Sequence, residues 1–295
     1  MIDLHMHSQE SDGSLSPAAL AAACAKAGVT AAALTDHDTL AGCRRFIAAC
    51  AKVGVQGIAG VELSAEFAPG TMHILGYMPT TSIEPMQAVL SEVQASRAER
   101  NQQILTALDR QGYSLSQAEV EGFAGSGMTG RPHIAAAMVA RGYVKDRREA
   151  FDRFLAKGRD AYCERYRLSP ADCVQTIRAH GGAAVLAHPF TLRLSENKLS
   201  ACVSELVSHG LSGIEVFYPE HSQLRRRIYQ RLAKRFAVIQ TGGSDFHGEA
   251  NPAISIGRGF GNVFVSESVL EALQERVDLQ VPQLDNLICD EVQGE

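Results

Sequence analysis

The sequence has no apolar run long enough to span a membrane and no Cys-x-x-Cys pair among its seven cysteines. Its Ala-rich stretch, residues 18–34, is interrupted by Lys26, Gly28 and Thr30, and the N-terminus has neither the basic nor the apolar region of a signal peptide. An odd number of cysteines without a paired motif favours reduced structural thiols over a disulfide framework. We therefore expect a cytoplasmic protein with no membrane partner.

The sequence also lacks an excess of basic residues, since 28 Lys and Arg stand against 33 Asp and Glu, for a formal net charge of −5. This charge argues against a protein that coats polyanions, but it is compatible with a local anion pocket. The 295 residues are 45% hydrophobic and 21% charged, which is ordinary for a globular protein with a large core. The length fits one large α/β domain or one domain with an insertion.

The first motif lies near the N-terminus, where His5-x-His7 is followed by Asp12. We predict a strand over residues 2–6. His5 and His7 are two positions apart, so on a strand both side chains leave the same face. Two imidazoles on one face, with a carboxylate five residues further on, predict half of a metal site.

Predicted strands alternate with predicted helices on both sides of a central segment. The strands are expected at residues 2–6, 30–34, 55–63, 72–78, 183–187, 214–217 and 236–241. Helices are expected over residues 17–27 and 170–180, each with a serine N-cap and a proline at its first position, and over residues 38–52 with Asp38 as the N-cap. This alternation is typical of parallel strands with helices outside them.

Polar side chains fall repeatedly on these strands or just beyond them. Six of the ten histidines and two acidic residues have such positions: His5, His7, His37, His73, His188, His247, Glu62 and Asp245. In parallel α/β barrels the carboxyl ends of the strands converge on one face, which carries the chemistry. We therefore expect these residues to meet, although they lie far apart in the sequence.

The candidate ligands are histidines and carboxylates without cysteine, a set that suits manganese, zinc or iron rather than a thiolate-held structural zinc. They exceed what one tetrahedral site can use, which favours two or three metals that share bridging carboxylates. Such a centre predicts metal-assisted phosphoester hydrolysis, with metal-dependent deamination or amide hydrolysis as the chemical rival. A structural or regulatory metal-binding module is the non-catalytic alternative, and the excess of ligands argues against it.

Residues 80–167 break the alternation and are predicted to be helical, with helices over residues 84–111, near Gln117, and over residues 131–140 and 148–156. Between Ser91 and Arg167, 13 Lys and Arg outnumber 10 Asp and Glu, so positive charge is concentrated here. We predict an inserted, mainly helical domain at 80–167 that forms a lid over a discontinuous barrel. The barrel would comprise residues 1–79 and 168–285, followed by a surface tail at 286–295.

The arginines of this segment allow two interpretations. Arg97 and Arg100 lie three apart on one predicted helix face, and Arg131 begins a helix at Arg-Pro-His. The start of a helix is a favourable position for binding an anion. The alternative is that these side chains form an ordinary solvated face, and the sequence pattern leaves both interpretations open.

The motifs together resemble those of the PHP (polymerase and histidinol phosphatase) family. The matching segments are His5-x-His7, Asp12, Thr35-Asp36-His37-Asp38, Glu62, His73, Ala187-His188-Pro189 and Ser244-Asp245-Phe246-His247. The resemblance implies a distorted (β/α)7 barrel around a centre of two or three divalent metals, with Mn²⁺ expected first and Zn²⁺ or Fe²⁺ as alternatives.

The resemblance also implies how the ligands are shared. One metal would be held by His5, His7, Glu62 and Asp245, a second by His37 and His247, and a third by Glu62, His73 and His188. Asp12 occupies a position that is a metal ligand in some members of the family, and it would either ligate metal or contact substrate here.

Three further segments, residues 96–100, 129–133 and 218–221, resemble the bacterial branch of 3′,5′-nucleoside bisphosphate phosphatases, which includes 5′→3′ exoribonucleases acting on short RNA. The resemblance implies release of the 3′-phosphate from a nucleoside 3′,5′-bisphosphate to give the 5′-mononucleotide. It implies a small phosphorylated nucleotide or a short 5′-phosphorylated RNA as substrate, and no obligate protein partner. Hydrolysis of histidinol phosphate or another small phosphomonoester is the alternative.

Under this hypothesis, Arg97, Arg100 and Arg131 would clamp a second phosphate, because a planar guanidinium matches a phosphate better than an ammonium does. His133, in the same segment as Arg131, is expected to contact the substrate as well.

Three residues are expected to act in catalysis. His221 or His247 would supply a proton to the leaving oxygen, and His221 would also contact the substrate. Asp36 is expected to orient a ligand imidazole from behind, since it is adjacent to His37.

Overall fold

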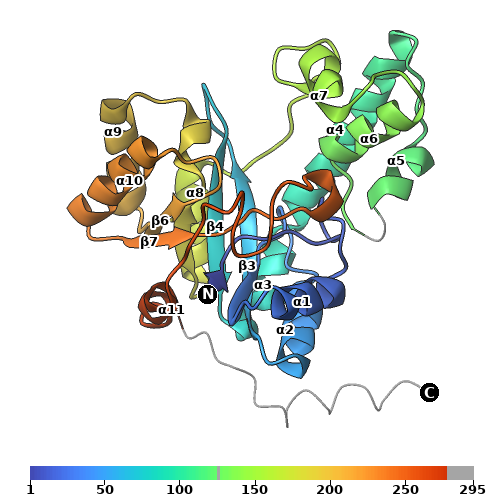
Figure 1. Cartoon of the computed structure of the whole chain (residues 1–295). Coiled ribbons are helices and arrows are strands. Elements are labelled where there is room, and N and C mark those ends of the chain that lie inside the picture. The colour runs from blue at the N-terminus through green and yellow to red at the C-terminus, as the bar shows by residue number, and fades with distance from the viewer. Residues whose placement is uncertain (125–126, 278–295) are drawn as a thin grey trace.

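The computed structural model describes residues 1–124 and 127–277 (Figure 1). The tail expected at 286–295 and the last expected barrel residues, 278–285, lie outside this range. None of the described helices is both long and apolar enough to cross a membrane. The six described cysteines are free thiols, four of them buried.

Seven strands form one sheet, in which each strand pairs with the next one along the chain. They are β1 (Ile2–Asp3), β2 (Ala31–Leu34), β3 (Gln56–Ala65), β4 (Met72–Met78), β5 (Ala183–Leu186), β6 (Gly213–Phe217) and β7 (Ile239–Gly242). A parallel bridge between Met6 and Phe246 joins the segment after β1 to the segment after β7, so the two edges of the sheet meet. The predicted α/β barrel of seven strands is confirmed.

The direction of β4 differs from our prediction, because β4 is antiparallel to both β3 and β5. Only residues 66–71 connect β3 to β4, which is too short for the crossover that a parallel pair requires. The start of β4 therefore lies at the rim where the other strands end, and His73 pairs with Ser64 of β3 there.

Helices cover the outside of the barrel, with α1 (Pro17–Lys26) and α2 (Cys43–Lys52) on one side and α8 (Pro170–Ala179), α9 (Glu196–Ser208) and α10 (Gln223–Arg235) on the other (Figure 1). The hydroxyls of Ser16 and Ser169 cap α1 and α8, as the sequence predicts. The prediction that Asp38 caps α2 is wrong, since this helix begins at Cys43 after Gly42.

Alternate residues of the strands supply two apolar clusters. Ala32 and Leu34 of β2 face outward into a cluster beneath the surrounding helices, whereas Ala31 and Ala33 face the inside of the barrel. The inner cluster is completed by residues of α11 (Glu267–Gln274), which lies at the end of the barrel away from the helical insertion (Figure 1). Because this end of the barrel is apolar, the polar side chains lie at the opposite rim.

The insertion between β4 and α8 is helical, as predicted. It contains α3 (Ile83–Val89), α4 (Ser91–Arg110), α5 (Gln117–Ala124), α6 (Arg131–Ala140) and α7 (Arg147–Ala150), followed by a π-helical turn (Phe151–Leu155). The single helix expected over residues 84–111 is divided into α3 and α4 at Leu90.

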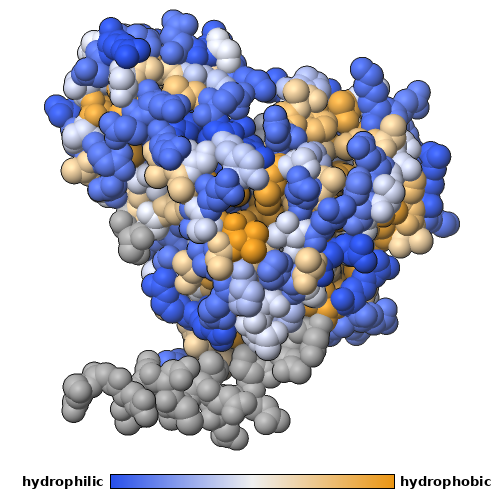
Figure 2. Space-filling view, turned by 180° about the vertical axis from the view of Figure 1, so that it is seen from behind, coloured by the Kyte–Doolittle hydropathy of each residue, from blue (hydrophilic) through white to orange (hydrophobic). Residues whose placement is uncertain are grey.

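Apolar residues of this insertion form a cluster of their own, which includes Ile104, Leu108, Ile134, Met138 and Phe154. Figure 2 shows the insertion as the upper left lobe, with a mostly hydrophilic surface. This separate cluster supports our proposal that residues 80–167 form a domain over the barrel rim.

Candidate metal centre and substrate pocket

The rim of the barrel brings together every residue expected to bind metal. In four overlapping groups, one nitrogen or carboxylate oxygen from each residue lies within 4.8 Å of the others. The groups are His7–Asp12–His37–His247, His5–His7–Asp245, His5–Glu62–His188 and His37–Glu62–His73. Residues from both ends of the chain meet here because their strands are neighbours around the barrel.

Glu62, almost fully buried on β3, lies at the centre of these groups. Its Oε1 is 2.7 Å from His73 Nδ1 and 2.8 Å from His188 Nε2. Its Oε2 is 2.9 Å from His37 Nδ1 and 3.3 Å from His7 Nε2. One carboxylate thus contacts imidazoles from four rim segments, an arrangement that suits a bridging ligand between two cations.

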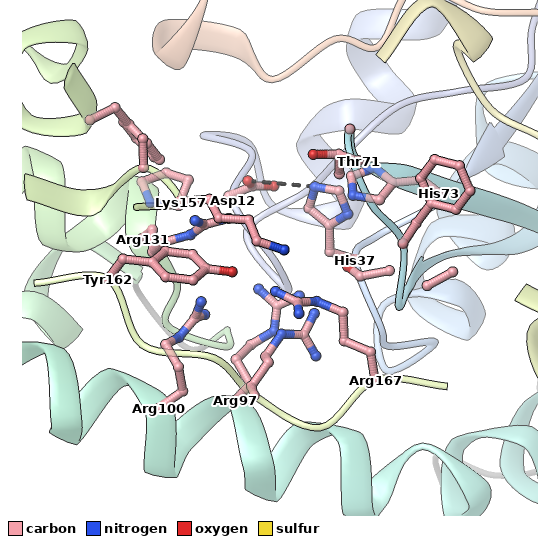
Figure 3. A pocket seen from close by; sticks show the side chains of 18 of the residues that line it. Asp12, His37, Thr71, His73, Arg97, Arg100, Arg131, Lys157, Tyr162 and Arg167 are labelled. Atoms are coloured by element: carbon pink, nitrogen blue, oxygen red, sulfur yellow. Dashed lines mark ion pairs between the residues drawn. The ribbon is translucent and has the colours of Figure 1, made fainter. Parts of the chain in front are cut away.

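Two further carboxylates flank this centre. Asp245 Oδ1 lies 3.0 Å from His7 Nε2. Asp12 Oδ1 lies 3.3 Å from His247 Nε2, and Asp12 also lines the neighbouring cavity, where Figure 3 marks its ion pair with His37. The position of Asp12 is therefore compatible with both of its expected roles.

The charges of these groups depend on one another. Burial by itself lowers the pKa of His7, but the Asp245 and Glu62 carboxylates outweigh burial and raise this pKa to about 10. Burial raises the pKa of Glu62, but His73 and His37 hold it well below its usual range. The carboxyl groups are therefore ionised at neutral pH, the state that metal binding requires.

Four buried atoms of the centre lie close to oppositely charged groups but make no well-aligned hydrogen bond to any described residue: His5 Nε2, His7 Nε2, His37 Nδ1 and Asp245 Oδ1. Buried polar atoms are nearly always paired, so four exceptions in one cluster call for an explanation. Each is a nitrogen or oxygen that can ligate a divalent cation, and together they fit metals that accept imidazole and carboxylate ligands.

Asp36 lies behind this centre, but it contacts serines rather than an imidazole. Its carboxylate accepts hydrogen bonds from Ser8 N at 2.8 Å, Ser8 Oγ at 2.6 Å and Ser11 Oγ at 2.6 Å. The expectation that Asp36 orients a ligand imidazole is therefore wrong for a direct contact. Asp36 instead anchors the loop that follows His7, and Ser11 Oγ lies 3.5 Å from His7 Nδ1.

Sequence reasoning missed two other buried carboxylates behind the centre. Asp3 accepts hydrogen bonds from Ser244 N at 2.9 Å and Ser244 Oγ at 2.6 Å, which fixes the backbone next to Asp245. Glu215 on β6 lies 3.0 Å from His5 Nδ1. Both are acidic residues inside short apolar strands. A charged residue in such a strand is unusual, and this could have identified both as candidate site residues from the sequence.

A cavity of about 390 Å³ opens between this centre and the helical insertion. Asp12, His37 and His73 line its barrel side, and Figure 3 shows arginines and Tyr162 on the opposite side. The basic residues that line the cavity are Arg97, Arg100, Arg131, Lys157, Arg165, Arg167 and Arg193. We call Arg97, Arg100, Arg131, Arg165 and Arg167 the arginine wall.

Asp38 holds two members of this wall. Its carboxylate contacts Arg97 and accepts a hydrogen bond from Arg165 Nη2 at 2.7 Å, while its other oxygen accepts one from Ser64 N at 2.9 Å. Burial raises the pKa of Asp38, but Arg97 and Arg165 hold it far below its usual range. Arg97 Nε and Arg165 Nη1 remain buried without a hydrogen-bond partner in the described chain, and both can donate to an anion.

Arg131 and Arg100 complete the part of the wall that the sequence predicted. Arg131 donates from Nη1 to the carbonyl of Leu155 at 3.1 Å, and its guanidinium lies 5.5 Å from the ring centre of Tyr162. Arg100 is almost fully buried; burial and the neighbouring arginines, Arg97 first, lower its pKa to about 8. An anion in the cavity would relieve this repulsion between cations.

The structure does not support the roles expected for His221. Its side chain is buried among Tyr218, Phe190 and Tyr229, and Nδ1 donates to the carbonyl of Val216 at 2.9 Å. Burial lowers the pKa of His221 to about 4. The side chain is therefore neutral at pH 7 and outside the set that lines the cavity, so it can neither donate a proton to the leaving oxygen nor contact the substrate there.

His133 and His247 also differ from part of what was expected. His133 is buried at the start of α6, where Nδ1 accepts a hydrogen bond from Gly130 N at 3.0 Å, and it is not among the residues that line the cavity. It therefore caps a helix instead of contacting the substrate.

His247 Nδ1 lies 2.8 Å from the carbonyl of Asp245, and Nε2 faces Asp12. This arrangement suits a metal ligand and leaves no free nitrogen to deliver a proton.

Sequence reasoning also missed four basic residues of the cavity: Arg165, Arg167, Lys157 and Arg193. The first three lie in residues 157–167, a segment whose basic character contributed to the charge excess of the insertion. Their neighbours in the sequence do not distinguish these four residues from ordinary surface residues. They reach the cavity through tertiary structure, which also brings Asp38 and Tyr162 there.

A cavity with divalent-metal ligands on one side and guanidinium groups on the other can bind and polarise a phosphate ester. The protein is accordingly a metal-dependent phosphoesterase. A model of the PHP domain matches residues 3–162, and the chain belongs to the PHP domain family.

Relatives of known sequence and structure agree with this class. The chain is 32% identical over 245 residues to a 5′-3′ exoribonuclease of Haemophilus influenzae, spanning 83% of this chain and 89% of that protein. It is 32% identical over 264 residues to a 3′,5′-nucleoside bisphosphate phosphatase of Chromobacterium violaceum, spanning 87% of this chain and 90% of that protein.

Among solved structures, one assigned as a metal-dependent phosphoesterase of Bifidobacterium adolescentis superposes with a TM-score of 0.83 at 26% identity, covering 93% of this chain and 96% of that one. A second, described as an amidohydrolase of Chromobacterium violaceum with bound sulfate and no metal, has a TM-score of 0.79 at 32% identity, covering 84% of this chain and 89% of that one.

Proposed function

We propose that the protein hydrolyses nucleoside 3′,5′-bisphosphates, releasing the 3′-phosphate and leaving the 5′-mononucleotide. The observation that carries this proposal is that candidate metal ligands and the arginine wall line opposite sides of one cavity (Figure 3). A substrate with a single phosphate needs only the metal side. Two phosphates separated by a ribose would use both sides at once.

The metal side would hold two or three divalent cations, with Mn²⁺ proposed first and Zn²⁺ or Fe²⁺ as alternatives. When bound, such cations supply a Lewis acid and an activated water for attack on phosphorus. We propose Glu62 as the ligand shared between cations, because its two oxygens face five imidazoles. The remaining ligands would come from the four groups described above.

The arginine wall would hold the phosphate that is not hydrolysed. Arg97 Nε and Arg165 Nη1 are buried donors without an acceptor in the described part of the chain, and Arg100 is a buried cation beside other cations. A phosphate with several acceptor oxygens can satisfy all of them through charge-assisted hydrogen bonds. The related structure from Chromobacterium violaceum holds sulfate and no metal, so a protein of this fold can bind an anion without metal.

The size of the cavity favours a small substrate. Its volume of about 390 Å³ lies within the range of small-molecule sites, which is roughly 300–1,000 Å³. We propose 5′→3′ exonuclease action on short 5′-phosphorylated RNA as a second activity, since only the terminal nucleotide would need to enter. Relatives named 5′-3′ exoribonucleases in Haemophilus influenzae and Escherichia coli support this proposal.

The main alternative is a phosphatase for histidinol phosphate or another small monoester. Such a substrate would leave Arg97 Nε and Arg165 Nη1 without an acceptor among the described residues, and it would leave Arg100 buried beside other cations, so we rank it second.

Phosphate release in the presence of Mn²⁺ tests the proposal. The substrates are 3′-phosphoadenosine 5′-phosphate, AMP, histidinol phosphate and a 5′-phosphorylated RNA oligomer, compared side by side. We expect selective turnover of the bisphosphate, with slower action on the RNA. Turnover of histidinol phosphate alone would overturn the substrate assignment and leave the metal centre standing.

A further inference from the structure

We propose that Glu215 is a positioning residue that selects which nitrogen of His5 ligates metal and fixes the place of His188 in the centre. Glu215 lies on β6, is fully buried and does not line the cavity. This inference rests on the metal centre proposed above, and it adds a residue that would act on two ligands without touching metal or substrate.

The two oxygens of Glu215 contact two different rim segments. Oε1 lies 3.0 Å from His5 Nδ1, just beyond β1, and Oε2 accepts a hydrogen bond from the backbone N–H of His188 at 2.7 Å, just beyond β5. Each oxygen of this buried carboxylate therefore has a hydrogen-bond donor within reach. Glu215 therefore ties together two ligands that enter from different strands.

The contact with His5 determines the orientation and tautomer of its ring. With Glu215 Oε1 as the acceptor of the Nδ1 proton, Nε2 is the nitrogen that His5 can offer to a metal. Nε2 faces the centre, 3.3 Å from Asp245 Oδ1 and 3.4 Å from Glu62 Oε2, where it has no hydrogen-bond partner among the described residues. This is the arrangement in which a carboxylate behind a histidine prepares the other nitrogen for metal.

The contact with His188 holds a strained piece of backbone. His188 has φ 24° and ψ 67°, a conformation that residues other than glycine rarely adopt. Its N–H is fixed by Glu215, and its Nε2 lies 2.8 Å from Glu62 Oε1. The imidazoles of His5 and His188 stack with ring centres 5.6 Å apart, so the two ligands supported by Glu215 are neighbours.

The substitution Glu215→Gln tests the hydrogen bonds of Glu215 without changing its packing. It preserves the shape of the side chain but replaces one acceptor oxygen with an NH₂ donor. If the amide NH₂ faces His188, two N–H groups oppose each other. If it faces His5, Nδ1 must become the acceptor and the ring proton moves to Nε2, which blocks the ligating lone pair. Either orientation damages one of the two ligands.

The effect should be confined to part of the centre. His5 belongs to the groups His5–His7–Asp245 and His5–Glu62–His188. The group His7–Asp12–His37–His247 contains neither residue that Glu215 contacts. Loss of Glu215 should therefore weaken one or two sites and spare the site built on this last group.

The test is Mn²⁺ binding by the full-length protein, followed by competition with a chelator and by metal analysis after dialysis. Wild type should bind two or three equivalents. Glu215→Gln should bind at least one equivalent 10- to 100-fold more weakly while at least one keeps wild-type affinity. Glu205→Gln on the exposed face of α9 is the matched control and should bind as wild type does.

Glu215→Asp keeps both acceptor oxygens but withdraws them by one methylene from His5 and His188, so it should lose affinity, though less than the Gln variant. If the Gln variant does not fold, the Asp variant alone decides, and wild-type affinity in it would overturn the proposal. Wild-type binding in a folded Gln variant, or equal weakening of every equivalent, would also overturn it. Failure of wild type to bind any of Mn²⁺, Zn²⁺ and Fe²⁺ would instead refute the proposed centre, and the role of Glu215 with it.

Discussion

Arg165 donates a hydrogen bond to Asp38 at 2.7 Å, across 127 positions of the sequence. The same carboxylate oxygen contacts Arg97 on α4, so two segments of the insertion are tied to one residue of the barrel rim. Asp38 adopts a left-handed backbone conformation, φ 55°, and its N–H donates to the carbonyl of Glu62 at 3.0 Å. It therefore links the arginine wall to the strand that carries the central carboxylate.

Replacing Asp38 with Asn should lower the stability of the protein. Removing one partner of a buried ion pair leaves uncompensated charge and typically costs about 3–5 kcal/mol. Urea unfolding of wild type and Asp38→Asn measures the loss. Asp152→Asn, which changes an exposed aspartate on the insertion, is the control and should shift the free energy of unfolding by less than about 0.5 kcal/mol. Equal stability of wild type and Asp38→Asn would contradict the link described here.

The burial of His221 should make folding sensitive to acid. Burial lowers its pKa to about 4, whereas the unfolded chain has the ordinary value of about 6.5. Between these values the unfolded state binds a proton and the folded state does not, so stability falls as the pH decreases from 6.5 towards 4.

The substitution His221→Asn removes this titration and keeps a donor for the Val216 carbonyl. Between pH 7 and pH 5, wild type should lose about 2 kcal/mol more stability than the variant. Urea unfolding at the two pH values measures the difference. Parallel losses in the two proteins would refute the assignment, and a collapse of kcat at unchanged KM would restore His221 as the proton donor.

The substitution Arg131→Ala should separate the two sides of the cavity. A hydrogen bond between charged groups contributes about 1.5–3 kcal/mol, so KM for 3′-phosphoadenosine 5′-phosphate should rise roughly 10- to 100-fold. KM for 3′-AMP, which lacks the 5′-phosphate, should change little. Arg153→Ala, at a solvent-exposed arginine paired with Glu149 on the same insertion, is the matched control. Equal increases for both substrates would remove the arginine wall from substrate recognition.

The positions of the metal-ligand candidates were predictable because each depends on local order. His5, His37 and His188 follow strands that are recognisable from apolar runs, and the barrel places strand ends together. The direction of β4 was predicted wrongly. The alternation of strands and helices suggested that all strands are parallel, but the short connection over residues 66–71 permits only an antiparallel hairpin between β3 and β4.

Contacts between distant segments could not be predicted in the same way. Glu215 meets His5 across 210 positions and Arg165 meets Asp38 across 127. No local periodicity carries such pairings, which arise only when the barrel closes and the insertion folds back over its rim. Asp38 shows the difference, since its sequence context resembles a helix cap while its tertiary partners make it an anchor for arginines.

The most direct test of the account compares kcat/KM for 3′-phosphoadenosine 5′-phosphate with kcat/KM for 3′-AMP, using the Mn²⁺-loaded wild-type protein. The two substrates present the same 3′-ester to the metal side and differ only in the phosphate meant for the arginine wall. Two charge-assisted hydrogen bonds predict a ratio of about 100 or more in favour of the bisphosphate. A ratio near one would contradict the claim that the arginine wall selects the substrate.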